Sequence, residues 1–320
     1  MRHHLGEKEY FCTSKKLLRT RIIRKMVEKI MKCSFIILNY NRADLTERCL
    51  SSVEAAMGGL EKEIIVVDNG SRDEVRKELR RICRDRCRLV QSNVNKGFGA
   101  GMDNGATEAE GKYLCFVNSD ITFSEDCISP LIGFMESHPQ VGIMTPQELN
   151  SEGRPVPSFK HRPGLCHDLF GNGMLEWLMP RRFLRRKKYD RTEPFAVAQV
   201  NGSLLLMRAD VFHAVGGFDP EIFLYYEEYD ICTRLAKAGY TAMVYPTAHF
   251  HHLHGGSTER SHWRLKVLMR SKLYTYRKHN GWLLWQLFRA ENALNVLRKP
   301  YKWYLLPVVF ASSPSAAHRP

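Results

Sequence analysis

The stretch Tyr113-Leu114-Cys115-Phe116-Val117-Asn118-Ser119-Asp120 decides the fold, because an apolar strand ends in it on a carboxylate. The first five residues predict a buried strand, which stops before Ile121-Thr122-Phe123 resumes the apolar pattern. Open α/β sheets bind ligands at the carboxyl ends of their strands, so we expect Asp120 at a binding edge. A carboxylate there suits a divalent cation that bridges a phosphate-bearing ligand, although a simple turn aspartate is the plain alternative.

Segments on both sides of this stretch alternate between strands and helices. This β-α repetition with continuous apolar strands predicts an α/β protein whose mostly parallel sheet carries helices on both faces. The expected strands cover residues 33–38, 63–67, 88–91, 113–117, 141–144, 196–208 and 241–245. The expected helices cover residues 44–56, 72–84, 98–109, 126–137 and 227–238. The rhythm breaks over 147–195, where prolines and the basic run 181–188 predict a loop-rich insertion.

Composition limits the classes of protein and of partner. The chain has 320 residues and a formal net charge of +14, which attracts nucleic acid, anionic lipid or nucleotide diphosphates. Nine scattered cysteines without a C-x-x-C pair indicate a reducing compartment. No apolar run is long enough to predict a spanning helix, and residues 1–30 lack the apolar core of a secretory signal. Met31 directly precedes the first strand and would be a natural start.

Two earlier strands also end in polar residues. Asn39-Tyr40-Asn41-Arg42 follows the strand 33–38, and Asp68-Asn69-Gly70-Ser71 follows the strand 63–67. We expect them side by side at the binding edge, where Asp68 can accept a hydrogen bond from a base or ribose. The same residue types form turns, and Ser71 can cap the next helix, so both interpretations of Asp68 stay open.

A glycine-rich segment, Asn95-Lys96-Gly97-Phe98-Gly99-Ala100-Gly101, precedes the expected helix 98–109. Glycines let backbone amides approach an anion, as in phosphate-binding loops. In isolation, a helix start that needs small residues for packing is the better interpretation.

The acidic cluster Glu227-Glu228-Tyr229-Asp230 follows later in the basic chain. As a solvated helix N-terminus, each carboxylate would contribute about 0.3–1 kcal/mol. The aromatic residues between Phe223 and Tyr229 favour a second interpretation, because like charges crowded against an apolar wall raise a carboxyl pKa and suit a general base.

Four histidines, His249, His251, His252 and His254, lie just before Gly255-Gly256-Ser257-Thr258. Neutral imidazoles can ligate a metal, but all four cannot be ligands of one ion. The glycines suggest a flexible loop that closes over a diphosphate.

Taken together and in order, these motifs resemble those of the family 2 glycosyltransferases of the GT-A fold, nearest to the rhamnosyltransferase-like branch. The resemblance covers residues 32 to 280 and rests on the segments 35–41, 66–71, 95–99, 116–120, 200–203, 216–219, 227–234 and 252–257. It implies a GT-A, Rossmann-like sheet with a C-terminal helical extension.

The resemblance also implies how the chain is divided. A GT-A catalytic domain over 32–258 would contain a nucleotide-binding half, 32–120, and an acceptor half, 121–258, with the insertion 147–195. Residues 1–31 would form a basic N-terminal extension, and residues 259–320 a basic, aromatic, helical region.

By position, the resemblance assigns the donor-binding side chains. Asp68 matches the nucleotide-contacting aspartate, and Asn39 and Asn41 match the first nucleotide-binding loop. Asn95, Gly97 and Asn118 complete the residues expected to bind the donor.

It assigns the metal and the base as well. Asp120 matches the metal ligand of a D-x-D-type motif in which Asn118 replaces the first aspartate, and the cofactor is Mg²⁺ or Mn²⁺. His252 best matches a late metal-ligand histidine, with His251 as its competitor. In the acidic pair, Glu228 would be the general base, with Glu227 and Asp230 as its catalytic neighbours.

The implied activity is inverting transfer of a sugar, with rhamnose as the branch-level expectation. The donor would be a nucleotide-diphosphate sugar, and the acceptor a saccharide or lipid-linked saccharide in cell-surface polysaccharide assembly. A non-catalytic nucleotide-sugar or glycan binder on the same fold is the alternative. No nucleic-acid-binding motif supports a nucleic-acid partner.

The last sixty residues interleave aromatic and basic side chains. Trp263, Trp282, Trp285, Trp303 and Tyr304 alternate with Arg and Lys. Such helices lie at anionic lipid surfaces, which predicts a cytoplasmic protein in peripheral contact with the inner face of the cell membrane. Ordinary core aromatics on C-terminal helices are the equal alternative.

Overall fold

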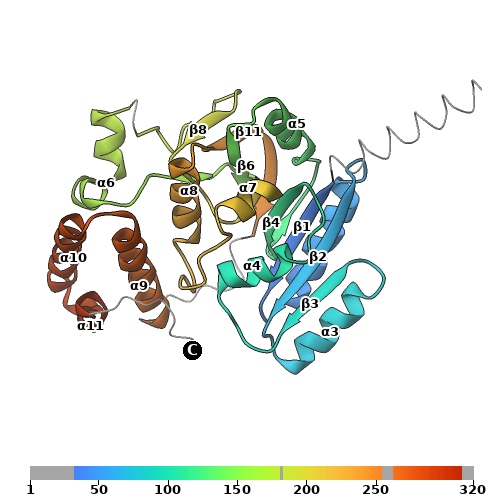
Figure 1. Ribbon diagram of the computed structural model, residues 1–320, viewed down its shortest axis with the longest axis horizontal. Helices are drawn as coiled ribbons and strands as arrows, with labels where there is room; N and C mark the ends of the chain where they lie inside the picture. The colour runs from blue at the N-terminus through green and yellow to red at the C-terminus, as the bar shows by residue number, and fades with distance from the viewer. Residues whose placement is uncertain (1–31, 181–182, 254–261, 312–320) are drawn as a thin grey trace, which may run out of the picture.

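The computed structural model describes residues 32–180, 183–253 and 262–311 and places a nine-stranded sheet at the centre of the molecule (Figure 1). The strands follow the order β3-β2-β1-β4-β10-β6-β11-β5, and β8 pairs with β11 off this path. The bounds are β1 Cys33–Asn39, β2 Lys62–Asn69, β3 Arg88–Ser92, β4 Tyr113–Asn118, β5 Ile121–Thr122, β6 Val141–Leu149, β8 Phe195–Val197, β10 Leu204–Arg208 and β11 Thr241–His252. A separate two-stranded sheet pairs β7 (Phe159–Lys160) with β9 (Gln199–Val200).

Helices cover both faces of the sheet, as the apolar strands predicted. Apolar side chains of α2, α3 and α5 pack on one face, and those of α4, α7 and α8 pack on the other. The bounds are α2 Ala43–Ala56, α3 Asp73–Cys83, α4 Phe98–Ala106, α5 Ser129–Ser137, α7 Ala209–Ala214 and α8 Glu227–Lys237.

Strand direction brings the polar strand ends together. β3, β2, β1 and β4 are parallel, with Asn39 opposite Asp68 and Leu38 opposite Asn118. β10 runs antiparallel to both neighbours, β4 and β6. The predicted mostly parallel α/β sheet is therefore confirmed, with β10 as its central exception.

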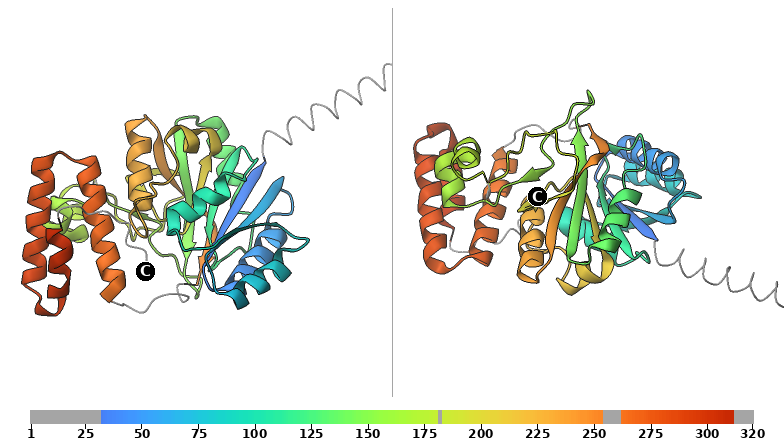
Figure 2. Two further views of the ribbon diagram at one scale, coloured as in Figure 1. Left: turned by 60° about the horizontal axis from the view of Figure 1, so that its bottom comes forward. Right: turned by 90° about the horizontal axis from the view of Figure 1, so that it is seen from above.

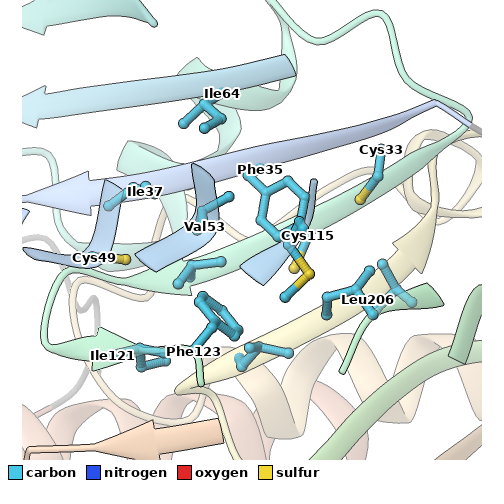
Figure 3. Close-up of a cluster of buried hydrophobic side chains, with 14 of the residues drawn as sticks. Cys33, Phe35, Ile37, Cys49, Val53, Ile64, Cys115, Ile121, Phe123 and Leu206 are labelled. Atoms are coloured by element: carbon cyan, nitrogen blue, oxygen red, sulfur yellow. The ribbon is translucent and has the colours of Figure 1, made fainter. Parts of the chain in front are cut away.

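The core under α2 and α5 shows why the central strands are apolar on both sides. Phe35, Cys115 and Phe123 are buried and point into one cluster with Leu206 (Figure 3). Phe35 and Phe123 meet edge to face, with their ring centroids 6.4 Å apart. Burial raises the pKa of the Cys115 thiol, so this residue packs as a small hydrophobe, as the sequence indicated.

Two segments differ from the sequence prediction. The single strand expected over 196–208 is divided into three: a bend at Ala198 separates β8 from β9, and a turn at Gly202-Ser203 separates β9 from β10. The insertion 147–195 contains a helix that the prolines concealed, α6 (Leu165–Leu178), which is kinked at Gly171 with φ of 70°.

The C-terminal helices form a separate small core beside the sheet domain. Tyr276, Trp285 and Phe288 are buried in it, and the Tyr276 and Phe288 rings stack 3.8 Å apart. These helices and α6 lie at the end of the molecule opposite to α3 (Figure 2). The bounds are α9 His262–His279, α10 Trp282–Leu297, the 3₁₀ helix η1 Pro300–Leu305 and α11 Leu306–Phe310. Among the described residues, no helix combines the length and apolar character needed to cross a membrane.

Candidate active site

Asp120 and His252 meet at the edge of the sheet. Asp120 lies in the turn between β4 and β5, and His252 is the last residue of β11. Antiparallel pairing places His252 opposite Ile121, so the imidazole reaches the neighbouring carboxylate. The distance from His252 Nε2 to Asp120 Oδ1 is 3.2 Å. The side chain of His251 projects to the opposite face, as alternation along a strand requires.

Glu148 completes this constellation and was not anticipated. It lies on β6, is 2% exposed, and its Oε1 is 2.9 Å from His252 Nδ1. Ser203 Oγ donates a hydrogen bond to Glu148 Oε2 over 2.9 Å. No signal in the sequence pointed to Glu148, because this residue lies beyond the strand predicted over 141–144, in the segment 147–195 that was expected to be rich in loops, whereas β6 extends to Leu149.

The two carboxylates determine the charge of His252. Burial by itself would lower the pKa of this imidazole, but hydrogen bonds and charges from Asp120 and Glu148 raise it to about 9. The ring therefore carries a proton near neutral pH unless another cation replaces it.

The donor set fits a divalent cation. Glu148 fixes the imidazole through Nδ1, as second-sphere carboxylates do for metal-ligating histidines, and this leaves Nε2 beside Asp120. Within the described residues, no cluster of three His, Cys, Asp or Glu side chains forms a metal cage. Mg²⁺ commonly uses one or two carboxylates and takes its other ligands from water and substrate phosphates, so an incomplete protein shell suits this chemistry. His254 and the glycines after it lie outside the described residues.

The acidic pair begins α8 behind two strained residues. Tyr225 and Tyr226 have φ of 68° and 73°, a conformation that is uncommon for aromatic side chains and is often stored at functional sites. Glu228 is 6% exposed, and its Oε1 accepts a bond of 2.7 Å from Lys160 Nζ on β7. A Cβ atom at Gly202 would lie 3.9 Å from Glu228 Oε2, at van der Waals contact, so this glycine directly borders the carboxylate.

Glu227 has a different environment from its neighbour. Burial, and then the charge of Glu228, raise the pKa of Glu227 to about 8. Its Oε2 has no hydrogen-bond partner among the described residues. Glu227 therefore retains its proton to higher pH than a solvent-exposed carboxyl does, as buried carboxyls of functional sites often do.

Asp230 does not belong with this pair. Its carboxylate is fully buried and lies 2.7 Å from each of Arg234, Lys278 and His279. Burial opposes ionisation, but these partners lower the pKa of Asp230 to about 2. These ion pairs join α8 to α9, and a catalytic role for Asp230 stays a prediction.

Asn39, Asn41 and Asp68 converge on Ser71 as expected. Ser71 Oγ accepts hydrogen bonds from Asn39 Nδ2 at 3.0 Å and from the Asn41 amide at 2.9 Å. Asp68 Oδ1 accepts from the Ser71 amide at 3.1 Å. Asn39 and Asp68 are fully buried, so in this structure they shape the loop, and their contact with a nucleotide stays a prediction.

Hydrogen bonds hold the backbone of the glycine-rich segment in place. Asn95 Oδ1 accepts from the Gly97 amide, and the Phe98 amide donates to Phe223 O over 2.8 Å. Gly97 has φ of 89°, and a Cβ there would lie 2.3 Å from Phe223 O. Close backbone packing is thus sufficient reason for this glycine, and donor binding by Asn95 and Gly97 stays a prediction.

Several buried polar atoms at the site have no partner. Asn118 Oδ1, Asn201 Oδ1 and Glu227 Oε2 belong to the seven such side-chain atoms among the described residues. Buried polar groups are nearly always hydrogen-bonded to protein, water or ligand, so these three atoms are candidates for contact with a bound ligand or an ordered water.

Comparison with known proteins identifies the family. Residues 34–215 match the model of the family described as glycosyl transferase family 2, and the chain belongs to that family. It is 26% identical over 264 residues to the N-acetylglucosaminyl-diphospho-decaprenol L-rhamnosyltransferase of Mycobacterium tuberculosis, covering 77% of this chain and 85% of the relative. It is 27% identical over 209 residues to the low-salt glycan biosynthesis hexosyltransferase Agl10 of Haloferax volcanii, covering 64% of this chain and 61% of that protein.

Solved structures share the fold. GalNAc-T7 with UDP, GalNAc and Mn²⁺ aligns with a TM-score of 0.59 and 15% identity, over 86% of this chain and 52% of that one. The mannosyltransferase PcManGT from Pyrobaculum calidifontis in complex with GDP-Man and Mn²⁺ aligns with a TM-score of 0.53 and 16% identity, over 89% and 77%. The protein is thus a glycosyltransferase with a GT-A-like fold, similar to rhamnosyltransferases, as its motifs predicted.

Proposed function

We propose that this glycosyltransferase moves a hexose, with rhamnose the first candidate, from a nucleotide-diphosphate donor to a lipid-linked saccharide in polysaccharide assembly. The single observation that carries the proposal is the Asp120–His252–Glu148 constellation at the sheet edge, beside strand ends that match a donor-binding site. The decaprenol-linked acceptor in the name of the mycobacterial relative supports the lipid-linked class. Such an acceptor requires the enzyme to work at the inner face of the cell membrane.

Asp120 Oδ1 and His252 Nε2 would hold the divalent cation, Mg²⁺ or Mn²⁺. The bound cation would neutralise charge on the diphosphate leaving group. Both GT-A structures named above contain Mn²⁺, which supports a divalent cofactor for the fold.

Glu228 is the base in this proposal. Lys160 Nζ holds Glu228 Oε1 through a hydrogen bond, and Glu228 Oε2 lies beside Gly202. In this proposal Oε2 accepts the proton of the acceptor hydroxyl. Glu227 holds its own proton near neutral pH, so it can donate a hydrogen bond to the acceptor. The acceptor oxygen attacks the anomeric carbon on the face opposite the diphosphate leaving group, as Glu228 removes the hydroxyl proton. This direction of attack inverts the anomeric configuration.

The test measures the anomeric configuration of the product by NMR after incubation with dTDP-rhamnose, UDP-sugars and GDP-sugars and a lipid-linked saccharide. One donor should give a product of inverted configuration. A retained configuration would contradict the role of Glu228. Donor binding without product from any donor and acceptor would favour the alternative, a nucleotide-sugar-binding protein without catalysis.

A further inference from the structure

The helices α6 and α10 expose apolar side chains that the sheet domain does not use. On α10, Leu283, Leu287, Leu294 and Leu297 recur on one face and are 47–64% exposed. Their spacing matches one stripe of an α-helix. Trp285 and Phe288 occupy the opposite face and are buried, so for Trp285 the second of the two interpretations, an ordinary core aromatic, is confirmed. The exposed stripe is thus the unpartnered side of an amphipathic helix.

α6 adds a second set of exposed apolar side chains at the same end of the molecule. Trp177 is 73% exposed and Leu178 is 54% exposed, while Trp282 at the start of α10 is 71% exposed. Asp168 of α6 pairs with Lys272 over 2.5 Å, and Lys272 also donates to Asn292 of α10. The two helices therefore belong to one structural unit (Figures 1 and 2). The α6–α10 surface is defined here by Trp177, Leu178, Trp282, Leu283, Leu287 and Leu294.

The charge of this unit decides which partner fits. Residues 262–311 contain ten Lys or Arg and a single acidic residue, Glu291, which is 8% exposed. The acidic residues of α6 are already paired, Asp168 with Lys272 and Glu176 with Arg186. A second copy of the chain would bring the same positive charge to the interface, whereas an anionic bilayer complements it. Exposed tryptophans also favour the headgroup level of a membrane.

We propose that the α6–α10 surface docks the protein on an anionic lipid bilayer. The proposal deepens the peripheral membrane contact of the proposed function by naming its surface and its lipid chemistry. The apolar stripe would lie in the interface between headgroups and acyl chains, with exposed basic residues such as Lys299 over the lipid phosphates.

The docking surface is connected to the segment before the proposed base. α9 connects the two regions, because Ser271 Oγ donates to Leu224 O over 2.8 Å and Arg264 contacts the Tyr225 hydroxyl. Both partners lie in the segment that leads directly into Glu227 and Glu228. The same helix thus packs in the docking unit and holds the strained turn before the proposed base.

The test is co-sedimentation of the full chain with vesicles of phosphatidylcholine alone and of phosphatidylcholine mixed with phosphatidylglycerol. Binding should require the anionic lipid and fall as salt is raised. The double variant Leu283→Gln/Leu287→Gln should weaken binding by roughly tenfold or more, because buried apolar area drives interfacial binding. Lys299→Glu should weaken it too, and Lys77→Glu on the distant helix α3 should not.

Two further measurements keep the result interpretable. Circular dichroism should show that each variant is folded, since all the altered side chains are exposed. Sedimentation velocity without lipid should show the same mass for the wild type and the double variant. Equal vesicle binding by both proteins, or a dimer that the leucine substitutions dissociate, would overturn the proposal. Vesicle binding needs no sugar transfer, so its failure is separate from failure of the proposed activity.

Discussion

His252 Nε2 lies 3.2 Å from Asp120 Oδ1, although the two residues are far apart in the chain. The antiparallel pairing of β11 with the short strand β5 brings them together. Glu148 holds the other side of the imidazole at 2.9 Å, so the histidine is clamped between two carboxylates. Asp120 and His252 would hold a divalent cation through their carboxylate and imidazole groups, and the cation would supply positive charge in place of a protonated imidazole.

Replacing Glu148 should weaken metal binding. In Glu148→Gln, the imidazole loses the charge of its second-sphere partner, and affinity for Mn²⁺ should fall by about 10- to 100-fold. The measurement is a Mn²⁺ titration by electron paramagnetic resonance in the presence of nucleoside diphosphate. The exposed Glu221→Gln is the control and should titrate like the wild type. Equal affinities for all three proteins would remove Glu148 from the metal site.

Replacing Glu228 should stop transfer while donor binding continues. Loss of a general base costs about 10²- to 10⁴-fold in rate, and Glu228→Gln keeps the shape of the side chain. The turnover number and the dissociation constant for the donor are measured separately, again with Glu221→Gln as the control. Turnover near the wild-type rate would show that another group takes the proton.

The protonation of Glu227 should affect stability as a function of pH. Its pKa is raised to about 8 in the folded state from 4.5, so the folded state retains a proton that the unfolded chain loses in this window. The contribution of Glu227 to stability therefore declines as pH rises from about 5 to about 8, by at most about 1.4 kcal/mol per pH unit. Glu227→Gln removes this dependence, so its unfolding free energy should rise relative to the wild type across the same range. Denaturant titrations of the two proteins at about pH 5 and about pH 8 measure this difference in unfolding free energy. The same change with pH in both proteins would contradict the prediction.

Asp230→Asn should destabilise the fold rather than act on the chemical step. It leaves Arg234, Lys278 and His279 without their shared carboxylate. Breaking a buried ion pair costs roughly 3–5 kcal/mol of unfolding free energy. Because Lys278 is partly exposed, the decrease for Asp230→Asn should lie at or below that range. The pKa of Asp230 is lowered to about 2 in the folded protein. Its ion pairs therefore contribute fully to folding stability above the usual carboxyl pKa, and this contribution is lost as pH falls through about 2. If Asp230→Asn kept the thermal stability of the wild type but lost turnover, the result would support a catalytic role for Asp230 instead.

Gly97→Ala should be destabilising for steric reasons. The added Cβ would lie 2.3 Å from Phe223 O at a backbone φ of 89°. Such strain costs roughly 1–3 kcal/mol or more, measured as unfolding free energy. Gly133→Ala on α5 is the matched control, because nothing lies within 4 Å of its Cβ position. Equal effects of the two substitutions would show that the loop adapts freely.

The sequence alone was sufficient to predict the positions of the candidate site residues that follow strand ends. Asp120 and the Asn39–Asp68 pair lie where apolar strands stop, so period and position predict them without tertiary information. Glu148 could not be found this way, because its role depends on the neighbouring positions of β6 and β11, which only the folded sheet defines.

The acidic cluster shows the same limit. Glu228 and Asp230 are close in sequence, but helical rotation directs one toward Lys160 and the other toward α9. On α10, Trp282 and Trp285 have similar sequence surroundings, yet one is exposed and the other is buried. Partners from distant segments decide such cases, and a local pattern does not contain them.

The most direct test of the central claim measures nucleotide release from a panel of sugar nucleotides with a lipid-linked saccharide acceptor. The reaction is run with Mn²⁺, after chelation of the metal, and with Glu228→Gln. We expect nucleotide release from one donor, and this release should require both the acceptor and the divalent cation and be lost in the variant. Release that survives both chelation and the Glu228→Gln substitution would contradict the proposed metal site and the proposed base.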